Sequence, residues 1–258
     1  MMTVFLNVIV PTYNASGTIS ELVEQLEKEL GQYDFRILLI DDASEDNTRE
    51  LILSLAGAYS NIDYYFAPKN QGQQASLRTG LGRMSVPCEY VVTMDDDLQN
   101  PVSVIPSLIE TIQSGYDLVY AVPVFGNEAG GRELEKECRE LGAGCHAPGG
   151  DSHAPGPPSR FRRLGSRFRD LLFDSFTNKP PGIRVSAFRI MTGNLAEKLA
   201  RSKKKFFYLS AEAFQYEIRA ANISYEYVPR RCGRSSYHFG KLLLVYCKLL
   251  ISYKLKVI

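Results

Sequence analysis

The chain has 258 residues, of which 45% are hydrophobic and 23% are charged, so it can form a globular domain that buries a sizeable core. This composition excludes a disordered, collagen-like, coiled-coil or disulfide-stapled protein, and no apolar run reaches the roughly 18 residues of a membrane-spanning helix. The net charge of +1 hides an asymmetry: residues 1–125 hold 6 Lys and Arg against 17 Asp and Glu, and residues 126–258 hold 24 against 12. The acidic half therefore suits a metal cation, and the basic half suits the phosphates of a nucleotide or a membrane.

Residues 1–125 alternate between short apolar runs, typical of buried strands, and amphipathic stretches with helical spacing. Strands are predicted over 4–10, 36–40, 62–66, 89–94 and 117–122. Helices are predicted over 19–30, around 51–55, over 75–84 and over 102–112. Because these strands are apolar on both faces, the pattern predicts an α/β fold with a mostly parallel sheet covered by helices.

Polar clusters follow three of the predicted strands: PTYN (11–14), DDAS (41–44) and DDDLQN (95–100). In parallel α/β sheets, ligands bind outside the carboxyl ends of the strands. These clusters are therefore the first candidates for a binding site.

The strongest motif is MDDDLQNP (94–101), in which three consecutive carboxylates repel one another unless a cation neutralises them. In an extended segment Asp95 and Asp97 share one face, and two such carboxylates with room for substrate phosphates are typical of a Mg²⁺ or Mn²⁺ site. The alternative is a cluster that caps the helix after Asn100 and Pro101, which explains one aspartate rather than three.

The other polar clusters carry weaker signals. DDASEDNT (41–48) also fits an ordinary turn and helix cap, and Tyr13 could stack on a base or pack its own loop. Asn70, Gly72 and Gln73 stand at a loop-to-helix junction, where backbone N–H groups can face an anion or a polar ligand. Neither a G-x-G-x-x-G nor a Walker motif is present, so a dinucleotide dehydrogenase or a P-loop NTPase is not expected.

Residues 126–158 are rich in Gly, Pro and Ser, and predict a flexible insertion that is either a lid or linker or a tolerated surface loop. They contain a loose group formed by Cys138, Cys145, His146 and His153, whose spacing fits no common zinc finger. The cysteine count of five is odd, and the N-terminus lacks the basic region and cleavage site of a signal peptide. Reduced thiols in a cytoplasmic setting are therefore expected.

Two basic amphipathic segments follow, over 160–176 and 239–258. Each places apolar residues on one helical face with Arg or Lys elsewhere, which suits an anionic membrane surface. The alternative is a helix that packs on the core and exposes a solvated basic face.

The motifs VIVPTYN, IDDASEDNT, KNQGQQASLRTGL and VVTMDDDLQNP, in this order and spacing, resemble the family 2 glycosyltransferases, and most of all the polyprenyl-phosphate sugar synthases. The resemblance is dense over 4–122, thinner over 180–240 and absent from 126–158. It implies a Rossmann-like nucleotide-sugar-binding fold of the GT-A type. It divides the chain into a nucleotide-sugar-binding half (1–125), the insertion (126–158), an acceptor-binding half (159–237) and an amphipathic C-terminal helix (238–258).

The resemblance also implies roles for individual residues. Those expected around the nucleotide are Pro11, Thr12, Tyr13, Asn14, Asp41, Asp42, Asn70, Gly72 and Asp96. Those expected at the metal are Asp95, Asp97 and Gln99. GIRVSAFRIM (182–191) and VPRRCGRSSYHF (228–239) resemble the acceptor and diphosphate segments of the family. Their implied contacts are Ser186, Arg189, Arg230, Gly233, Ser235 and Tyr237.

The implied reaction is an inverting, Mg²⁺- or Mn²⁺-dependent transfer of a sugar, with Asp97, Arg189 and Glu212 as the expected catalytic residues and UDP favoured as the donor nucleotide. A lipid phosphate acceptor is already ionised, whereas a glycan hydroxyl must lose a proton to a carboxylate. Hydroxyl-directed relatives carry an E-D pair where this chain has YLSAEAFQYE (208–217), with Glu212 but no neighbouring Asp. Glu212 is thus either a base or a residue at a helix start.

The missing aspartate favours a polyprenyl phosphate acceptor, with a hydroxyl on a lipid-linked or surface glycan as the alternative. A non-catalytic nucleotide-sugar-binding protein is a third class. The expected location is the cytoplasmic face of the membrane, held peripherally. No nucleic acid partner is expected, and homo-oligomerisation is left open.

Overall fold

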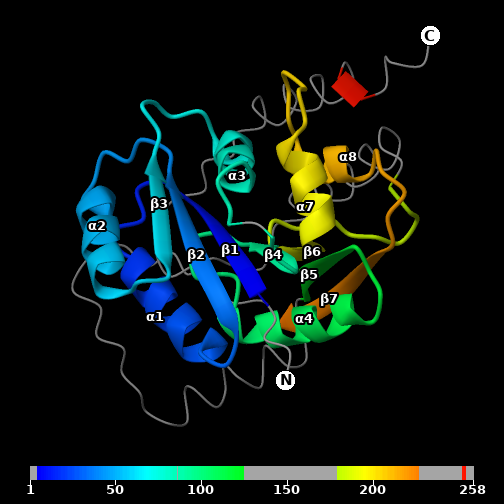
Figure 1. The fold of residues 1–258 in the computed structure, drawn as a ribbon, viewed down its shortest axis with the longest axis horizontal. Coiled ribbons are helices and arrows are strands. Elements are labelled where there is room, and N and C mark those ends of the chain that lie inside the picture. The colour runs from blue at the N-terminus through cyan, green and yellow to red at the C-terminus, as the bar shows by residue number, and fades with distance from the viewer. Residues whose placement is uncertain (1–4, 86, 125–178, 227–251, 254–258) are drawn as a thin grey trace, which may run out of the picture.

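Figure 1 shows the computed structural model of the protein, a seven-stranded sheet with helices packed on both faces. The structure describes residues 5–85, 87–124, 179–226 and 252–253. In the first half the elements are β1 (Phe5–Thr12), α1 (Ile19–Leu30), β2 (Asp34–Asp41), α2 (Thr48–Ala58), β3 (Ile62–Phe66), α3 (Gln73–Leu81), β4 (Tyr90–Thr93), a 3₁₀ turn (Val102–Val104), α4 (Ile105–Gln113) and β5 (Leu118–Val124). The second half adds β6 (Arg189–Thr192), α7 (Gly193–Ala200), α8 (Leu209–Ala213) and β7 (Ala220–Glu226).

The strand order is β3-β2-β1-β4-β6-β5-β7. β6 runs antiparallel to β4 and to β5, and every other pair among the described strands is parallel. The predicted α/β class and mostly parallel sheet are therefore confirmed. The insertion of β6 between β4 and β5 was not predicted, because its four residues are too few to give a periodic signal.

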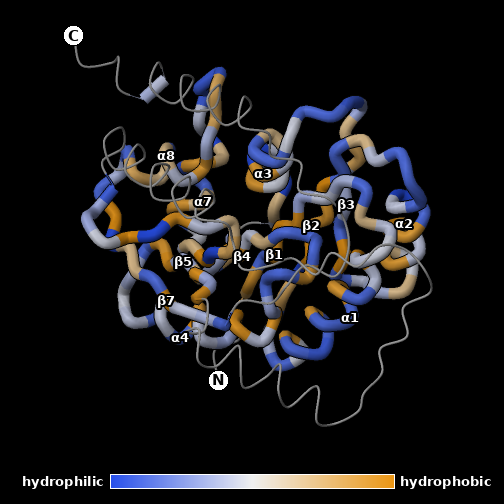
Figure 2. The backbone as a smooth tube through the Cα atoms, turned by 180° about the vertical axis from the view of Figure 1, so that it is seen from behind, coloured by the Kyte–Doolittle hydropathy of each residue, from blue (hydrophilic) through white to orange (hydrophobic). Residues whose placement is uncertain are grey.

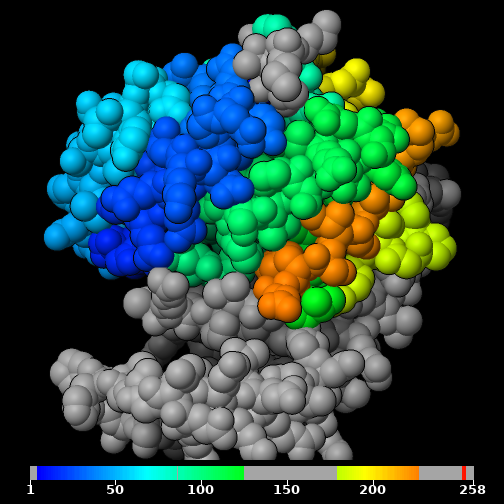
Figure 3. All heavy atoms as spheres, turned by 90° about the horizontal axis from the view of Figure 1, so that it is seen from below, coloured from blue at the N-terminus to red at the C-terminus, as the bar shows by residue number. Residues whose placement is uncertain are grey.

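The two faces of the sheet bury two hydrophobic cores, because successive strand residues point to opposite faces. Leu6, Val8 and Val10 of β1 pack with α1 and α4, whereas Ile9 packs with α3, α7 and α8. Figure 2 shows the resulting pattern, in which hydrophobic strands lie beneath helices whose outer turns are hydrophilic. Seen from below in Figure 3, α1, α4 and β7 lie side by side.

The elements of the second half complete the second core. Leu195 and Leu199 of α7 and Leu209 and Phe214, in and beside α8, are buried against α3. Tyr253, near the C-terminus, is buried in the same core with 8% of its surface exposed. Within the described ranges, no helix is long and apolar enough to cross a bilayer.

Gly193 at the start of α7 lies against the backbone that leads into β4. Its N–H donates to the carbonyl of Glu89 over 2.7 Å, and a Cβ on Gly193 would stand 1.9 Å from the carbonyl oxygen of Cys88. A backbone atom cannot move aside as a flexible side chain can. The β4–α7 contact therefore requires glycine at this position.

We expect Gly193→Ala to destabilise the protein by about 2–3 kcal/mol through overpacking. Gly57→Ala is the matched control, because Gly57 lies within α2 with nothing within 4 Å of an added Cβ. This control should be neutral or slightly stabilising, since alanine favours a helix. Urea unfolding measures both variants, and equal stabilities would contradict the close approach.

Candidate active site

The candidate site lies at the edge of the sheet where β1, β2, β3 and β4 end. The parallel pairing brings Thr12 beside Asp41, and Asp41 beside Phe66. Because β6 runs the other way, its first residue, Arg189, pairs with Thr93, the last residue of β4. One edge therefore gathers the polar clusters after β1, β2 and β4 together with a basic residue from the second half.

The three aspartates after β4 turn toward three different partners. β4 ends at Thr93, the backbone bends over residues 96–98, and Leu98 takes a positive φ of 59°. Asp95 Oδ1 accepts a hydrogen bond from the side chain of Gln73 in α3. The chain bends where it leaves the sheet, so residues 95–97 do not continue the extended strand as expected. The shared face of the Asp95 and Asp97 carboxylates stays a prediction.

The other two carboxylates bind backbone N–H groups. Asp96 Oδ2 accepts from the N–H of Tyr13 over 3.1 Å, and Asp97 Oδ1 accepts from the N–H of Gln99 over 3.1 Å. The loop after β4 is thereby joined to the loop after β1 and to the first turn of α3.

Burial and then the charges of Asp95 and Asp97 raise the pKa of Asp96 from 3.8 to about 7, against the lowering effect of the Tyr13 N–H. Burial is the larger cause, and the repulsion from the two neighbouring carboxylates adds to it, so a bound dication would stabilise the ionised aspartates. No cluster of three His, Cys, Asp or Glu side chains with metal-binding geometry occurs in the described part of the chain. The residues fit Mg²⁺ or Mn²⁺, which use one or two carboxylates and complete their coordination with phosphate and water.

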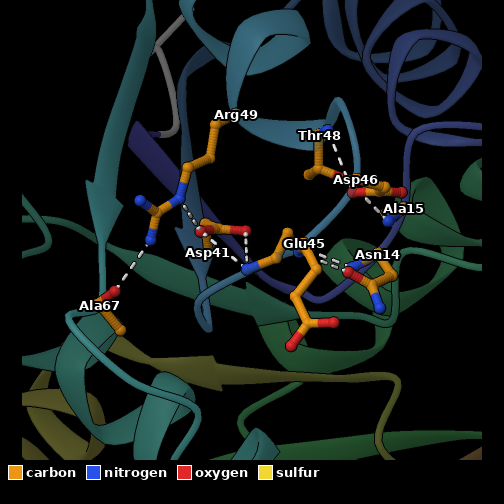
Figure 4. Close-up of polar contacts among 9 residues, drawn as sticks. Asn14, Ala15, Asp41, Glu45, Asp46, Thr48, Arg49 and Ala67 are labelled. Atoms are coloured by element: carbon orange, nitrogen blue, oxygen red, sulfur yellow. Dashed lines mark hydrogen bonds and ion pairs between the residues drawn. The ribbon is translucent and has the colours of Figure 1, made fainter.

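The loop after β2 is held by its own first carboxylate, as Figure 4 shows. Asp41 is fully buried, and its Oδ2 pairs with Arg49 Nε at 2.9 Å while both oxygens accept from the N–H of Ser44. Arg49 also donates to the carbonyl of Ala67 over 3.0 Å, which ties α2 to the end of β3. Asp41 therefore fixes the conformation of its own loop.

Asp42 holds the loop before α3. Its Oδ1 accepts from the N–H of Gln71 over 2.8 Å and its Oδ2 accepts from the N–H of Gly72 over 2.7 Å. Gly72 takes a φ of 88°, which glycine adopts without strain. The N–H groups of Gln71 and Gly72 thus face the carboxylate of Asp42, and Asn70 next to them is exposed.

The loop after β1 is pinned to the loop after β2. The Asn14 N–H donates to Ser44 Oγ over 2.9 Å, and Asn14 Oδ1 accepts from the N–H of Glu45 over 2.9 Å. Figure 4 also shows Ala15 bonded to Thr48 Oγ1. Tyr13 remains 45% exposed at the rim of the site.

Pro11 and Thr12 are buried at the end of β1. The pairing of β1 with β4 reaches only from Leu6 to Ile9, so Pro11 removes no hydrogen bond from that ladder. Thr12 Oγ1 is buried and has no hydrogen-bond partner among the described residues.

Arg189 is buried with 3% of its surface exposed. Its Nε donates to Thr93 Oγ1 over 3.1 Å and to the Ala187 carbonyl over 3.2 Å, and its Nη1 donates to Ser210 Oγ over 2.6 Å. The guanidinium lies 5.6 Å from the ring centre of Tyr120. Among the described residues no carboxylate pairs with it, so it is a buried cation at the carboxyl end of β4.

The preceding turn is locally ordered, since Ser186 Oγ accepts from the N–H of Phe188 over 3.2 Å. Glu212 in α8 has 5% of its surface exposed. Its Oε1 accepts from Ser202 Oγ over 2.9 Å, and its Oε2 lies 2.9 Å from Lys204 Nζ. Glu212 thus lies in the short helix α8, as the helix-start alternative predicted, but its carboxylate is buried and bound by Ser202 and Lys204.

Sequence reasoning missed two residues of α3 that join the site to the second half. Gln74 Oε1 accepts from the N–H of Leu209 over 2.9 Å, and the guanidinium of Arg78 donates to the carbonyls of Ser202 and Lys204 over 2.6 and 2.9 Å. Nothing local in the sequence marks them, because their partners lie more than a hundred residues away.

Several predicted features lie outside the described residues. These are Arg230, Gly233, Ser235 and Tyr237, the group of Cys138, Cys145, His146 and His153, the insertion 126–158, the segment 160–176 and most of the segment 239–258.

The α/β sheet, with polar loops at the carboxyl ends of its strands, has the fold of the GT-A glycosyltransferases. The family described as Glycosyl transferase family 2 matches residues 7–188, and the chain belongs to this family. The resemblance read from the sequence motifs is thereby confirmed.

Two curated relatives are similar to about half of the chain. The undecaprenyl-phosphate 4-deoxy-4-formamido-L-arabinose transferase of Erwinia tasmaniensis is 34% identical over 131 residues, which are 50% of this chain and 40% of that protein. The putative glycosyltransferase CsbB of Bacillus subtilis is 34% identical over 118 residues, which are 45% of this chain and 35% of that protein. The chain thus covers less than half the length of these relatives.

Solved structures show the same fold at low identity. S. aureus TarS 1–349 in complex with UDP-GlcNAc is 18% identical with a TM-score of 0.55, and the match covers 97% of this chain and 68% of that one. Glucosyl-3-phosphoglycerate synthase of Mycobacterium tuberculosis, in complex with Mn²⁺, UDP and phosphoglyceric acid, is 17% identical with a TM-score of 0.57, covering 96% and 76%.

The raised pKa of Asp96 predicts a pH-dependent stability in the absence of divalent metal. A carboxyl whose pKa rises on folding binds its proton more tightly in the folded state, so its stabilising contribution is present below pH 3.8 and is lost as the pH rises through about 7. We expect Asp96→Asn to become more stable relative to the wild type as the pH increases from 4 to 8.

Urea unfolding of both proteins across this range measures the difference. Glu24→Gln, which removes an exposed carboxyl from α1, is the control and should show no such trend. A stability difference between Asp96→Asn and the wild type that stays constant with pH would contradict the crowding of carboxylates.

Proposed function

We propose that the protein transfers a sugar, with inversion at the anomeric carbon, from a UDP-sugar to a polyprenyl phosphate at the cytoplasmic membrane face. The observation that carries this proposal is the meeting of Asp95, Asp96 and Asp97 with the loop after β1 and with the buried cation Arg189 at one edge of the sheet. An acidic group for a metal and a basic group for a phosphate are thus brought together from the two halves of the chain.

In this proposal Asp95 and Asp97, with Gln99 nearby, hold Mg²⁺ or Mn²⁺ against the diphosphate of the donor. The bound cation offsets the negative charge that develops on the nucleoside diphosphate as it leaves. The raised pKa of Asp96 supports this assignment, because burial and then the charges of Asp95 and Asp97 disfavour its ionised form in the absence of a cation. Arg230, outside the described residues, is the proposed second clamp on the diphosphate.

The nucleotide is proposed to lie across the loops after β1 and β2. The exposed ring of Tyr13 can stack on the base. The Thr12 hydroxyl, which has no hydrogen-bond partner among the described residues, can bond to a polar ligand atom. Asp41 and Asp42 act from beneath, since each holds the backbone of a loop that surrounds the nucleotide. Structures of similar fold hold UDP-GlcNAc in TarS, UDP in the mycobacterial synthase and GDP-mannose in the mannosyltransferase of Pyrobaculum calidifontis. The preference for uridine therefore rests on the resemblance of the sequence motifs to those of the polyprenyl-phosphate sugar synthases.

A phosphate acceptor agrees with the surroundings of Glu212. The carboxylate accepts a hydrogen bond from Ser202 and pairs with Lys204, so both of its oxygens are engaged. Such a group is poorly placed to take a proton from a hydroxyl, and an ionised lipid phosphate requires no base. The names of the Erwinia relative and its counterparts in Pseudomonas and Yersinia refer to undecaprenyl phosphate and thus support this acceptor.

The metal site is tested by Asp97→Ala, which we expect to abolish donor turnover and to remove the thermal stabilisation that a UDP-sugar with Mn²⁺ gives the wild type. GDP-sugars should stabilise less than UDP-sugars. Asp34→Ala, which removes an exposed carboxylate at the start of β2, is the control and should behave like the wild type. Unchanged turnover in Asp97→Ala would refute the proposed catalysis.

The acceptor is tested by Glu212→Gln, which keeps the hydrogen bond to Ser202 and removes the charge opposite Lys204. Turnover with polyprenyl phosphate should remain within about 10-fold of the wild type, at a lower unfolding temperature, because breaking a buried ion pair is destabilising. A base for a hydroxyl acceptor would instead cost about 100- to 10,000-fold in turnover. A loss of turnover of that size would contradict the lipid phosphate as the acceptor and favour a glycan hydroxyl. Activity on a soluble sugar acceptor without the lipid would do the same.

A further inference from the structure

The loop between α7 and α8 presents a row of cations to solvent. Arg201, Lys203 and Lys205 are exposed, whereas Ser202 and Lys204 between them are half-buried and face the protein. Exposed and half-buried side chains alternate along the loop, so the three exposed side chains form its outer edge. This edge, residues 201–205, is called the basic loop below.

The protein holds the basic loop in place from beneath. The guanidinium of Arg78 in α3 donates to the carbonyl oxygens of Ser202 and Lys204 over 2.6 and 2.9 Å. The side chains of Ser202 and Lys204 both reach the buried carboxylate of Glu212. Because the backbone is already fixed, the binding of a partner to the exposed cations loses little conformational entropy in the loop.

Little negative charge neutralises the outer edge. Arg201 pairs with Glu197 at 3.1 Å, but 79% of the Arg201 side chain is exposed, and pairs of this kind contribute little. Among the described residues no carboxylate pairs with Lys203 or Lys205. Both remain available to an anionic partner.

The basic loop lies on the same side of the sheet as the candidate site. β6 starts at the site edge and runs away from it, and α7 returns the chain toward that edge. Gln74, in the first turn of α3, then binds the N–H of Leu209 at the start of α8, and its neighbour Gln73 binds Asp95. The loop and the aspartates are therefore attached to the same helix.

The C-terminal segment reaches the basic loop as well. The Nζ of Lys204 lies 3.9 Å from the ring centre of Tyr253. The Tyr253 hydroxyl accepts from the N–H of Tyr208 over 3.3 Å and donates to the carbonyl of Phe206 over 3.4 Å. Figures 1 and 2 show residues 252–253 beside the loop that follows α7. Tyr253 belongs to the segment whose sequence predicts a basic amphipathic helix at a membrane surface.

We propose that the basic loop docks on the anionic headgroups of a phospholipid bilayer and so turns the site edge toward the membrane. Lysine clusters are attracted to such a surface by about 1 kcal/mol per residue. Tyr253, whose ring lies against Lys204, belongs by its sequence to the segment predicted to lie at a membrane surface. The inference rests on the proposed function in one respect, because a polyprenyl phosphate must reach the site from the bilayer.

The test compares two variants of the full chain with the same change in net charge. Lys203→Ala/Lys205→Ala removes two charges from the basic loop, and Lys28→Glu makes an equal change at an exposed position in the last turn of α1, on the other face of the sheet. Co-sedimentation with phosphatidylcholine vesicles, with and without 30% phosphatidylglycerol, measures binding. The double variant should bind the anionic vesicles about 10- to 30-fold more weakly, and the Lys28 variant like the wild type.

Equal loss in both variants, or no loss in the double variant, would overturn the docking proposal. It would also be overturned if the double variant kept its vesicle affinity and lost affinity for a single-stranded oligonucleotide, because the loop would then serve nucleic acid. The thermal shift with UDP-sugar and Mn²⁺ is measured on the same proteins and should be unchanged. If the wild type gives no thermal shift with UDP-sugar and Mn²⁺, but the double variant still loses vesicle binding, the transferase proposal is refuted and the docking proposal stands.

Discussion

Burial of three adjacent carboxylates after β4 is the constraint around which the site is arranged. They stand at a partly buried bend, and burial together with their mutual repulsion raises the pKa of Asp96. Each carboxylate is held by a donor from a different place: the side chain of Gln73, the backbone of Tyr13 and the backbone of Gln99. The same bonds that hold the acidic group therefore also fix the loop after β1 and the start of α3.

The antiparallel strand β6 joins the two oppositely charged halves of the chain into one site. Its direction puts Arg189 beside Thr93, at the end of the strand that leads into the aspartates. α3 makes a second connection, since Gln73 and Gln74 bind residues on either side and Arg78 holds the loop after α7. In the proposed reaction both the donor and the acceptor carry negative charge, and the structure places the acidic group after β4 and the buried cation Arg189 at the same end of the sheet.

Much of the first half of the fold could be predicted because its signals are local. Apolar runs and helical spacing place β1 to β5 and their helices within a few residues of their observed bounds. β6, α7 and α8 could not be predicted in the same way, because they are short and are stabilised by packing on distant residues. Residues 95–97 do not continue the strand as expected, because the backbone bends over 96–98, where Asp96 binds the loop after β1 and Asp95 binds α3.

The sequence by itself determined the family, the α/β class, the polar clusters at strand ends and the identity of the aspartates, because each is written in consecutive residues. Only the tertiary structure decided which groups these residues meet. Asp41 binds its own loop, Asp42 binds the loop before α3, Glu212 is paired with Lys204, and Arg189 reaches the end of β4 through an inserted strand. The pairings of Asp42 with Gly72 and of Arg189 with Thr93 join residues far apart in the chain, and the free energy that selects them comes from burial and hydrogen bonding in the folded protein, which no local pattern records.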